Sequence, residues 1–493
     1  MSHYLKAIQI GVAWALLAMW GTGALAQTEV PAEPADTTVD ATVVTEETPV
    51  DPAVADIEGE STEADAAEAT EAEAPAGPSF EKAHNRYMAG QYKSAIKLFD
   101  EILTATPDEG PARVGKARAQ QAMGRTEAAL ETLAAPPADN AAWLLMRAEL
   151  LSSQGDYADA IALANQAYEL NTLWAPAVRD YGQLLKKVGR DDDALTVFEQ
   201  VTDIVADGDY REDAAQLVAI GEILQVYSEM KGLRASEQAN NIFNNYFQVA
   251  YQDVDRGYWP AHMAAGWFAL EKHRIKTASD EFGAALMLNP NIPEAHLGLG
   301  VIALSQWNFE GCLAEVKTAL ATNPNLADAH VLRTMCLLQW RRYDQATDAV
   351  AKVLELNPNH IEALSLAAAL AVRGGDVELA KTYSDRVAAI DSRCETLPLA
   401  IAEWLSAGRQ FDEAHGYYQE AVLMAPASAS AWTGLGELYM QVGREADAKE
   451  AFEKAHEIDD FRADIVNYLG LLDDMELYDV YETEHFIVKV DGD

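Results

Sequence analysis

The sequence predicts an all-α solenoid built from helix pairs, and two observations support this prediction. First, residues 431–455 place Trp432, Gly436, Tyr439, Ala448 and Phe452 at spacings that suit two antiparallel helices. Second, a related stretch is found at almost every step of about 34 residues back along the chain. A unit of this size cannot bury its apolar face alone, so neighbouring copies must stack on one another.

Within one unit, small and large apolar residues have different tasks. Small residues at Gly436, Ala448 and Ala455 let the two helices approach closely, whereas aromatic residues such as Phe452 fill the space between them. Apolar residues make up 49% of the chain, which is ample for such a core.

These residues resemble the tetratricopeptide repeat in type and spacing, over residues 79 to about 479. The resemblance implies a right-handed superhelix whose first helices line a concave groove. We expect about eleven units, arranged as a repeat block (79–208), a diverged helical pair (209–256), a second block (257–462) and a capping helix (463–479). The diverged pair is either a hinge between two blocks or an ordinary degenerate repeat.

Residues 1–26 have the pattern of a signal peptide. Lys6 precedes an apolar run from Ile8 to Trp20, and Ala24-Leu25-Ala26 offers a cleavage site. We therefore expect an exported protein, located in the periplasm or cell envelope or secreted. The alternative is an uncleaved membrane anchor, because the run is about as long as the ~20 residues that span a bilayer.

Residues 27–78 are expected to form a disordered acidic linker. They contain fifteen acidic residues and no Lys or Arg, and they lack the apolar surface that offsets chain entropy. The segment is interpreted as a solvated tether, or alternatively as an acidic docking tail.

The charge of the whole chain restricts its partners. A formal net charge of -43 opposes nucleic-acid binding, which needs clustered Lys and Arg. Anionic membranes are disfavoured for the same reason, so membrane association is expected only if the signal segment stays uncleaved. Protein or peptide segments are the expected partners, and no oligomeric state is predicted.

Two sets of residues are candidates for partner binding. The later repeats carry an apolar strip on their first helices, suited to an extended or helical segment: Met263, Trp267, Leu297, Val301, Met335 and Leu338. The alternative is that the strip packs against the neighbouring turn. In the earlier repeats Arg179 and Lys186, with Arg118 and Lys187, form a basic island for an acidic segment, unless Asp191–Asp193 neutralise the lysines.

No residue pattern predicts catalysis, a cofactor or a metal site in this chain. His262, His296 and His330 recur at one repeat position, but stacked repeats hold equivalent positions ~10 Å apart, whereas zinc ligands lie ~2.1 Å from the ion. We therefore expect the histidines to serve packing. Cys312, Cys336 and Cys394 lack CxxC spacing, and Cys312 is expected to be buried. Nucleophile-elbow, phosphate-loop and His-Glu-x-x-His motifs are absent from the sequence.

The last segment, residues 480–493, departs from the helical pattern. Residues Tyr481–Val490 alternate apolar and polar side chains, which predicts one terminal β-strand. The string Glu482–Val488 resembles the opening strand of gluzincin-type zinc peptidase domains that follow tetratricopeptide arrays in some exported bacterial proteins. We therefore expect a non-catalytic scaffold that binds partner segments in its groove. The alternative is the docking half of a secreted zinc metallopeptidase whose catalytic domain lies beyond residue 493.

Overall fold

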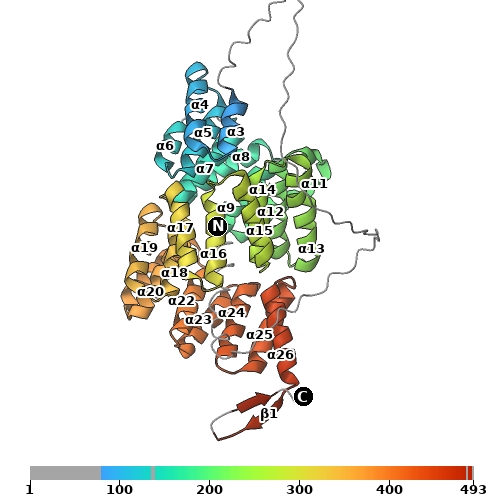
Figure 1. The fold of residues 1–493 in the computed structure, drawn as a ribbon, viewed down its shortest axis with the longest axis vertical. Helices are drawn as coiled ribbons and strands as arrows, with labels where there is room; N and C mark the ends of the chain where they lie inside the picture. Colours follow the sequence, from blue (N-terminus) through green and yellow to red (C-terminus); the bar gives the residue numbers. More distant parts are fainter. Residues whose placement is uncertain (1–78, 135–138, 485–486, 491–493) are drawn as a thin grey trace, which may run out of the picture. The chain divides into compact units, whose positions relative to one another are not determined.

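The computed structural model describes residues 79–134, 139–484 and 487–490, all within one compact unit. The expected signal peptide (1–26) and acidic linker (27–78) lie outside the described residues. Eleven helix pairs run from α3 to α25 in this part of the chain and are followed by one further helix, α26 (Figure 1). This arrangement confirms the all-α solenoid.

The bounds of the helices follow the predicted period closely. In chain order the pairs are α3 (Phe80–Met88) and α4 (Tyr92–Ala105), α5 (Gly110–Ala122) and α6 (Thr126–Thr132), α7 (Ala141–Gln154) and α8 (Tyr157–Leu170), α9 (Ala175–Lys187) and α10 (Asp191–Phe198) with α11 (Val201–Asp207), α12 (Ala214–Met230) and α13 (Ala235–Ile242), α14 (Trp259–Glu271) and α15 (Ile275–Leu288), α16 (Pro293–Ser305) and α17 (Phe309–Thr322), α18 (Ala327–Gln339) and α19 (Tyr343–Leu356), α20 (Ile361–Gly374) and α21 (Val377–Ile390), α22 (Thr396–Ala407) and α23 (Phe411–Met424), and α24 (Ala429–Gln441) and α25 (Glu445–Ile458), followed by α26 (Ala463–Glu476). No helix in the described ranges is both long enough and apolar enough to cross a membrane.

Close packing within each pair depends on small residues opposite one large aromatic ring. Phe282 of α15 is fully buried, and its ring lies over Gly266 of α14 and Gly298 of α16. A Cβ atom at either glycine would overlap the ring. The sequence pattern of small and aromatic positions therefore describes the interior of the repeat stack correctly.

Residues 209–256 form a pair that is longer than its neighbours. It begins with a 3-10 turn, η1 (Asp209–Glu212), and α12 has 17 residues. After α13 the chain continues through two π-helical segments, η2 (Phe243–Phe247) and η3 (Ala250–Val254). One buried cluster joins this pair to α9 and α10 on one side and to α14 on the other. Such continuous packing favours a degenerate repeat over a hinge.

A seam joins loops that are between 197 and 205 residues apart in the sequence. We define the seam as the contact of the loops after three first helices, at Gly90, Gly124 and Gly155, with three Asn-Pro-Asn loops after second helices, at 289–291, 323–325 and 357–359. The second asparagine of each loop donates a side-chain hydrogen bond to the glycine carbonyl, at 3.2, 2.9 and 3.2 Å respectively. Early and late repeats therefore lie against each other directly.

Glycine in the seam is required by close approach. Gly124 and Gly155 have φ angles of 72° and 90°, and a Cβ atom at either would overlap the carboxamide of Asn323 or Asn357. Later repeats place a non-glycine residue at the same left-handed position, namely His273, Trp307, Arg341 and Arg409, with φ between 58° and 62°. The turn alone therefore tolerates a side chain, whereas the seam does not.

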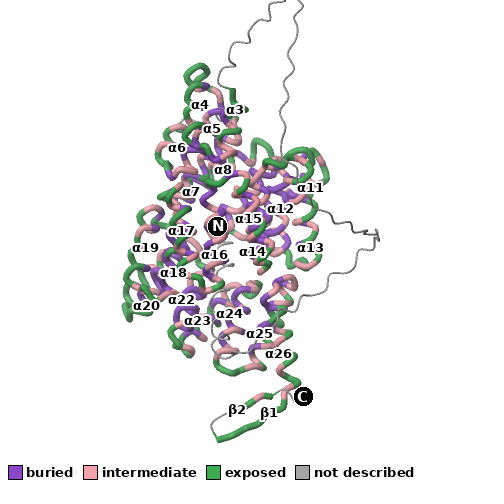
Figure 2. Tube along the Cα trace, viewed as in Figure 1, coloured by how far each residue is buried: buried purple, intermediate pink, exposed green. Residues whose placement is uncertain are grey.

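The C-terminal segment forms a hairpin, which corrects the expectation of one strand. Strand β1 (Asp479–Glu482) pairs antiparallel with β2 (Ile487–Val490), and Val480 lies opposite Lys489. The expected single strand, 481–490, contains the last two residues of β1 and all of β2. Both strands are largely exposed and are green in Figure 2, whereas buried residues line the packed faces of the helices.

Candidate functional site

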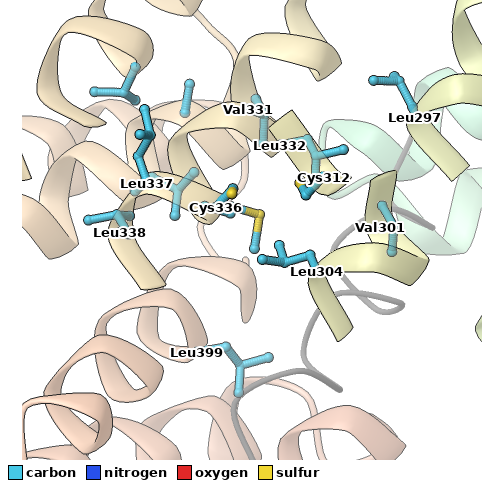
Figure 3. Packing of buried hydrophobic residues seen from close by; sticks show 14 of the residues in the cluster. Leu297, Val301, Leu304, Cys312, Val331, Leu332, Cys336, Leu337, Leu338 and Leu399 are labelled. Atoms are coloured by element: carbon cyan, nitrogen blue, oxygen red, sulfur yellow. The ribbon is translucent and has the colours of Figure 1, made fainter. Parts of the chain in front are cut away.

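The apolar strip expected to line a groove is buried in the structure. Five of its residues are between 0% and 7% exposed: Met263, Leu297, Val301, Met335 and Leu338. Figure 3 shows Leu297, Val301 and Leu338 among the buried hydrophobic residues of one cluster, with Val301 close to Leu304. The sixth, Trp267, is half-buried, and its ring lies 5.0 Å from the ring of Phe282.

The reason is the packing between successive first helices. Helices α14, α16 and α18 contact one another as well as their own second helices, and the strip residues belong to the resulting cluster. A partner cannot reach the five buried residues in this arrangement, so the expectation of an accessible apolar strip is corrected for all of its residues except the half-buried Trp267. An accessible site has to be formed by other residues.

A cavity of about 850 Å³ provides such a site. One wall consists of residues from α7, α9, α12 and α14, and the other of residues from α20, α22 and the segments 424–430 and 458–462. Contacts between residues far apart in the sequence bring these two groups of repeats together, namely Gly155 with Asn359 in the seam, Asp191 with Arg393, and Lys272 with Asp459. The cavity is therefore a product of the long-range contacts.

Both members of the basic island that were proposed as site residues line this cavity. Arg179 and Lys186 lie on its α9 wall. The guanidinium of Arg179 is 2.7 Å from Asp180 and 2.8 Å from Glu222, and although burial alone would lower its pKa, these two carboxylates raise it. Arg179 is thus neutralised by Asp180 and Glu222, whereas Asp191 and Asp193, expected to neutralise the lysines, pair with Arg393 and Arg190.

Carboxylates dominate the lining of the cavity. It has twelve acidic side chains, at Glu149, Asp180, Asp191, Asp192, Glu222, Glu229, Glu271, Glu362, Asp391, Glu395, Glu403 and Asp459. The cationic side chains number six, at Arg179, Lys186, Lys187, Lys272, Arg393 and Arg462. The lining therefore has an excess of negative charge and favours cationic groups.

Glu149 is an accessible carboxylate on the α7 side of the cavity. Its side chain is accessible within the cavity and accepts one hydrogen bond from Gln121, at 2.8 Å. The surrounding protein raises the pKa of Glu149 by desolvation, and the nearby Asp180 charge adds to this effect. A cation placed beside Glu149 would lower its pKa again.

At the opposite end of the cavity, Lys272 connects α14 to the last repeat. The residue is 3% exposed, and its ammonium lies 2.8 Å from Asp459, 3.5 Å from Glu229 and 3.6 Å from Glu271. Burial opposes the charge, but these three carboxylates raise the pKa of Lys272. The group is therefore a fixed cation and holds residues 272 and 459 together.

The buried side chain of His360 lies next to Glu362, one of the carboxylates that line the cavity. His360 lies 3.1 Å from Glu362, which lines the cavity, and 3.5 Å from Asp328. Burial alone would lower the pKa of His360, but the two carboxylates raise it to about 9. Burial would raise the pKa of Glu362, and the adjacent His360 lowers it to about 2. The two groups therefore form a charged pair around neutral pH.

The histidines that recur at one repeat position have separate partners. His262 and His296 each lie 2.7 Å from a glutamate of the following helix, Glu281 and Glu315. His330 lies 3.2 Å from the carbonyl oxygen of Pro324. In the described part of the chain no three His, Cys, Asp or Glu residues are grouped so that they could hold a metal ion. Cys312 is fully buried, as expected.

The sequence analysis did not identify the acidic residues of the cavity, although they occupy the same repeat position as part of the predicted apolar strip. Glu149, Gln183 and Glu222 are each the ninth residue of a first helix, in α7, α9 and α12, and all three line the cavity. Trp267, Val301 and Met335 are the ninth residues of α14, α16 and α18. The change from polar to apolar residues at one repeat position was the signal that could have found the site.

Fold and cavity together define the class of this protein as a helical-repeat solenoid. The tetratricopeptide repeat family profile matches residues 86–150 and 405–467, so the chain contains tetratricopeptide repeats near both ends of the array. No curated protein matches the sequence significantly.

Two solved structures of low similarity accompany this match. One is described as the APC/C hetero-tetramer Cut9-Hcn1, with 14% identity and a TM-score of 0.33, covering 79% of this chain and 88% of that chain. The other is yeast Tom70, with 14% identity and a TM-score of 0.36, covering 80% of this chain and 87% of that chain. Both TM-scores are low, so neither likeness supports an inference about this chain.

Proposed function

We propose that this chain is an exported scaffold that captures an extended segment of a partner protein in its cavity, without catalysis of its own. The observation that carries the proposal is the 850 Å³ cavity, which has both polar and apolar accessible surface and lies between two groups of repeats. Sites of this volume are large enough for specific ligand binding. The proposed ligand is protein, because the net charge of -43 opposes nucleic acid and anionic membranes.

Site-specific photo-crosslinking tests this function. A photo-reactive residue is placed at Gln183, which lines the cavity, and the full chain is exposed to extract of the source cells. The control has the same residue at Glu131, on the exposed side of α6 and outside the cavity. We expect discrete crosslinks to a partner segment from position 183 only. Crosslinks of equal yield from position 131 would remove the cavity from the proposal.

Export is a separate part of the proposal and rests on residues 1–26. Cell fractionation, with the intact mass of the chain from each fraction, tests it. We expect the chain outside the cytoplasm, with a mass that corresponds to a start at Gln27. An uncleaved chain in the membrane fraction would instead support the anchor, and a cytoplasmic chain would contradict export.

The docking half of a secreted zinc peptidase is the second candidate, and the hairpin favours it. Val480, Tyr481 and Ile487 are more than half exposed, although a two-stranded hairpin is marginally stable unless more structure covers it. An adjoining domain would cover these side chains. Sequencing the gene beyond codon 493 tests this candidate, which requires a His-Glu-x-x-His helix in the same reading frame.

A further inference from the structure

We propose that the cavity receives a cationic, extended peptide segment, with a lysine or arginine side chain seated beside Glu149 and Glu222. This inference rests on the proposed function and adds the chemistry of the partner to it. It reverses the expectation that the basic island binds an acidic segment.

Most of the cationic side chains that line the cavity are already paired with carboxylates. Arg179 pairs with Asp180 and Glu222, and Lys272 pairs with three carboxylates. Arg393 lies 3.2 Å from Asp191, and Arg462 lies 2.6 Å from Asp464. Four of the six cations are therefore paired with carboxylates, and Lys187 lies 4.9 Å from the centre of the Tyr157 ring. An anionic segment would have to break these pairs while it approached twelve carboxylates.

On α7 and α12, the carboxylates of Glu149 and Glu222 are accessible to a cationic group of a ligand. In the described part of the chain, Glu149 has no Lys or Arg within ion-pair distance and shares a hydrogen bond with Gln121 only. The Glu222 side chain remains 29% exposed despite its pairing with Arg179. An incoming ammonium or guanidinium can therefore reach both carboxylates.

The buried hydroxyl of Ser228 also indicates a ligand, independently of charge. Ser228 of α12 is 5% exposed and lines the cavity, yet its Oγ has no hydrogen-bond partner in the described ranges. Buried hydroxyl groups are usually paired. Because this Oγ atom is itself buried, a rotation of the Ser228 side chain toward the cavity would let a backbone amide or carbonyl of a bound segment satisfy it.

The distribution of the carboxylates around the cavity favours a peptide segment as the ligand. Carboxylates of the cavity come from α7, α9, α10, α12, α14, α20 and α22, so several cations spaced along one chain are needed to reach them. Leu145, Leu184 and Val226 lie between the acidic groups. Such apolar surface suits the aliphatic stems of Lys and Arg, whose charged ends reach outward.

Fluorescence anisotropy with defined peptides tests the proposal on the full chain. The probe is a short labelled peptide of alternating lysine and valine, and the comparison peptide has glutamate in place of lysine. We expect only the lysine peptide to bind. Glu149→Lys should weaken its binding about tenfold or more. Glu131→Lys, which makes the same change of charge outside the cavity, should leave binding unchanged.

Several outcomes would overturn the proposal. These are equal binding of the glutamate peptide, equal weakening by Glu131→Lys, or binding of free spermine as tightly as the lysine peptide. Because Glu149→Lys could impair folding, Asp192→Asn at an exposed residue of the lining serves as a second variant and should weaken binding several-fold. Crosslinks from position 183 without binding of cationic peptides would refute this inference and leave the proposed function intact.

Discussion

At the scale of single residues, Gly124 shows how a backbone position can serve a distant contact. Its φ of 72° is nearly the same as the 75° of Gly443. The carboxamide of Asn323 fills the space beside Gly124, whereas no atom lies within 4 Å of the corresponding space at Gly443. A comparison of substitutions at the two glycines therefore distinguishes the effect of backbone strain on stability from the effect of close packing in the seam.

We predict that Gly124→Ala destabilises the protein more than Gly443→Ala. Left-handed backbone strain costs of the order of 1 kcal/mol at either position, and overlap with Asn323 should add about 1–2 kcal/mol at position 124. Urea unfolding midpoints of the two variants measure the difference. Adding Asn323→Ala to Gly124→Ala should remove most of the extra loss. Equal midpoints for the two single variants would show that close approach is unimportant.

His360 gives stability a defined dependence on pH. Its pKa is raised from 6.5 to about 9, so its stabilisation is complete below pH 6.5 and is lost as pH rises through about 9. The pKa of Glu362 is lowered from 4.5 to about 2, so its stabilisation is present above pH 4.5 and is lost as pH falls through about 2.

We predict that His360→Gln lowers the free energy of unfolding by about 3 kcal/mol near neutral pH, because it leaves two buried carboxylates without their cation. Urea unfolding from pH 6.5 to about 9 should show falling stability for the unmodified chain and a much flatter profile for the variant. His415→Gln is the control, since His415 contacts the hydroxyl of Tyr439 and no carboxylate. A variant with an unchanged pH slope would contradict the assignment.

At the scale of elements, local periodicity predicts the helices but not the seam. Phe282 and the two glycines beneath its ring lie within the stretch 266–298, so one repeat length contains the whole pattern. The seam joins Gly90 and Gly124 to loops 201 positions further along the chain, and no local preference reports such a contact. Its signal was present as Asn-Pro-Asn at 289–291, 323–325 and 357–359. Read alone, these prolines indicate only the end of a helix.

We predict that Asn323→Ala with Asn325→Ala loosens both sides of the seam. Each lost side-chain hydrogen bond costs about 1 kcal/mol. Hydrogen exchange should therefore become faster at residues 121–126 as well as near 323–325. Asn171→Ala is the matched control, because Asn171 makes the same local bond to the Leu173 amide and no described bond to a distant loop. Faster exchange confined to residues near 323–325 would argue against the seam.

At the scale of the whole molecule, the sequence predicted the class of fold, and two of its candidate site residues, Arg179 and Lys186, line the cavity, whereas the apolar strip is largely buried. Repeat position identified the side chains that face inward, and in α7, α9 and α12 these are Glu149, Gln183 and Glu222 on the cavity wall. In α14, α16 and α18 the same position is buried by neighbouring helices. Only the packing of the described repeats against one another distinguishes these two environments.

The central claim is that early and late repeats meet directly along the seam. The most direct measurement places a photo-reactive residue at Arg125, which is exposed and adjoins Gly124. Crosslinked peptides from the monomeric full chain are then identified by mass spectrometry. We predict intramolecular crosslinks to residues around Asn323–Asn325, whose side chain at 325 lies 2.9 Å from the Gly124 carbonyl. Crosslinks confined to α5, α6 and α7 would show an open solenoid and contradict the claim.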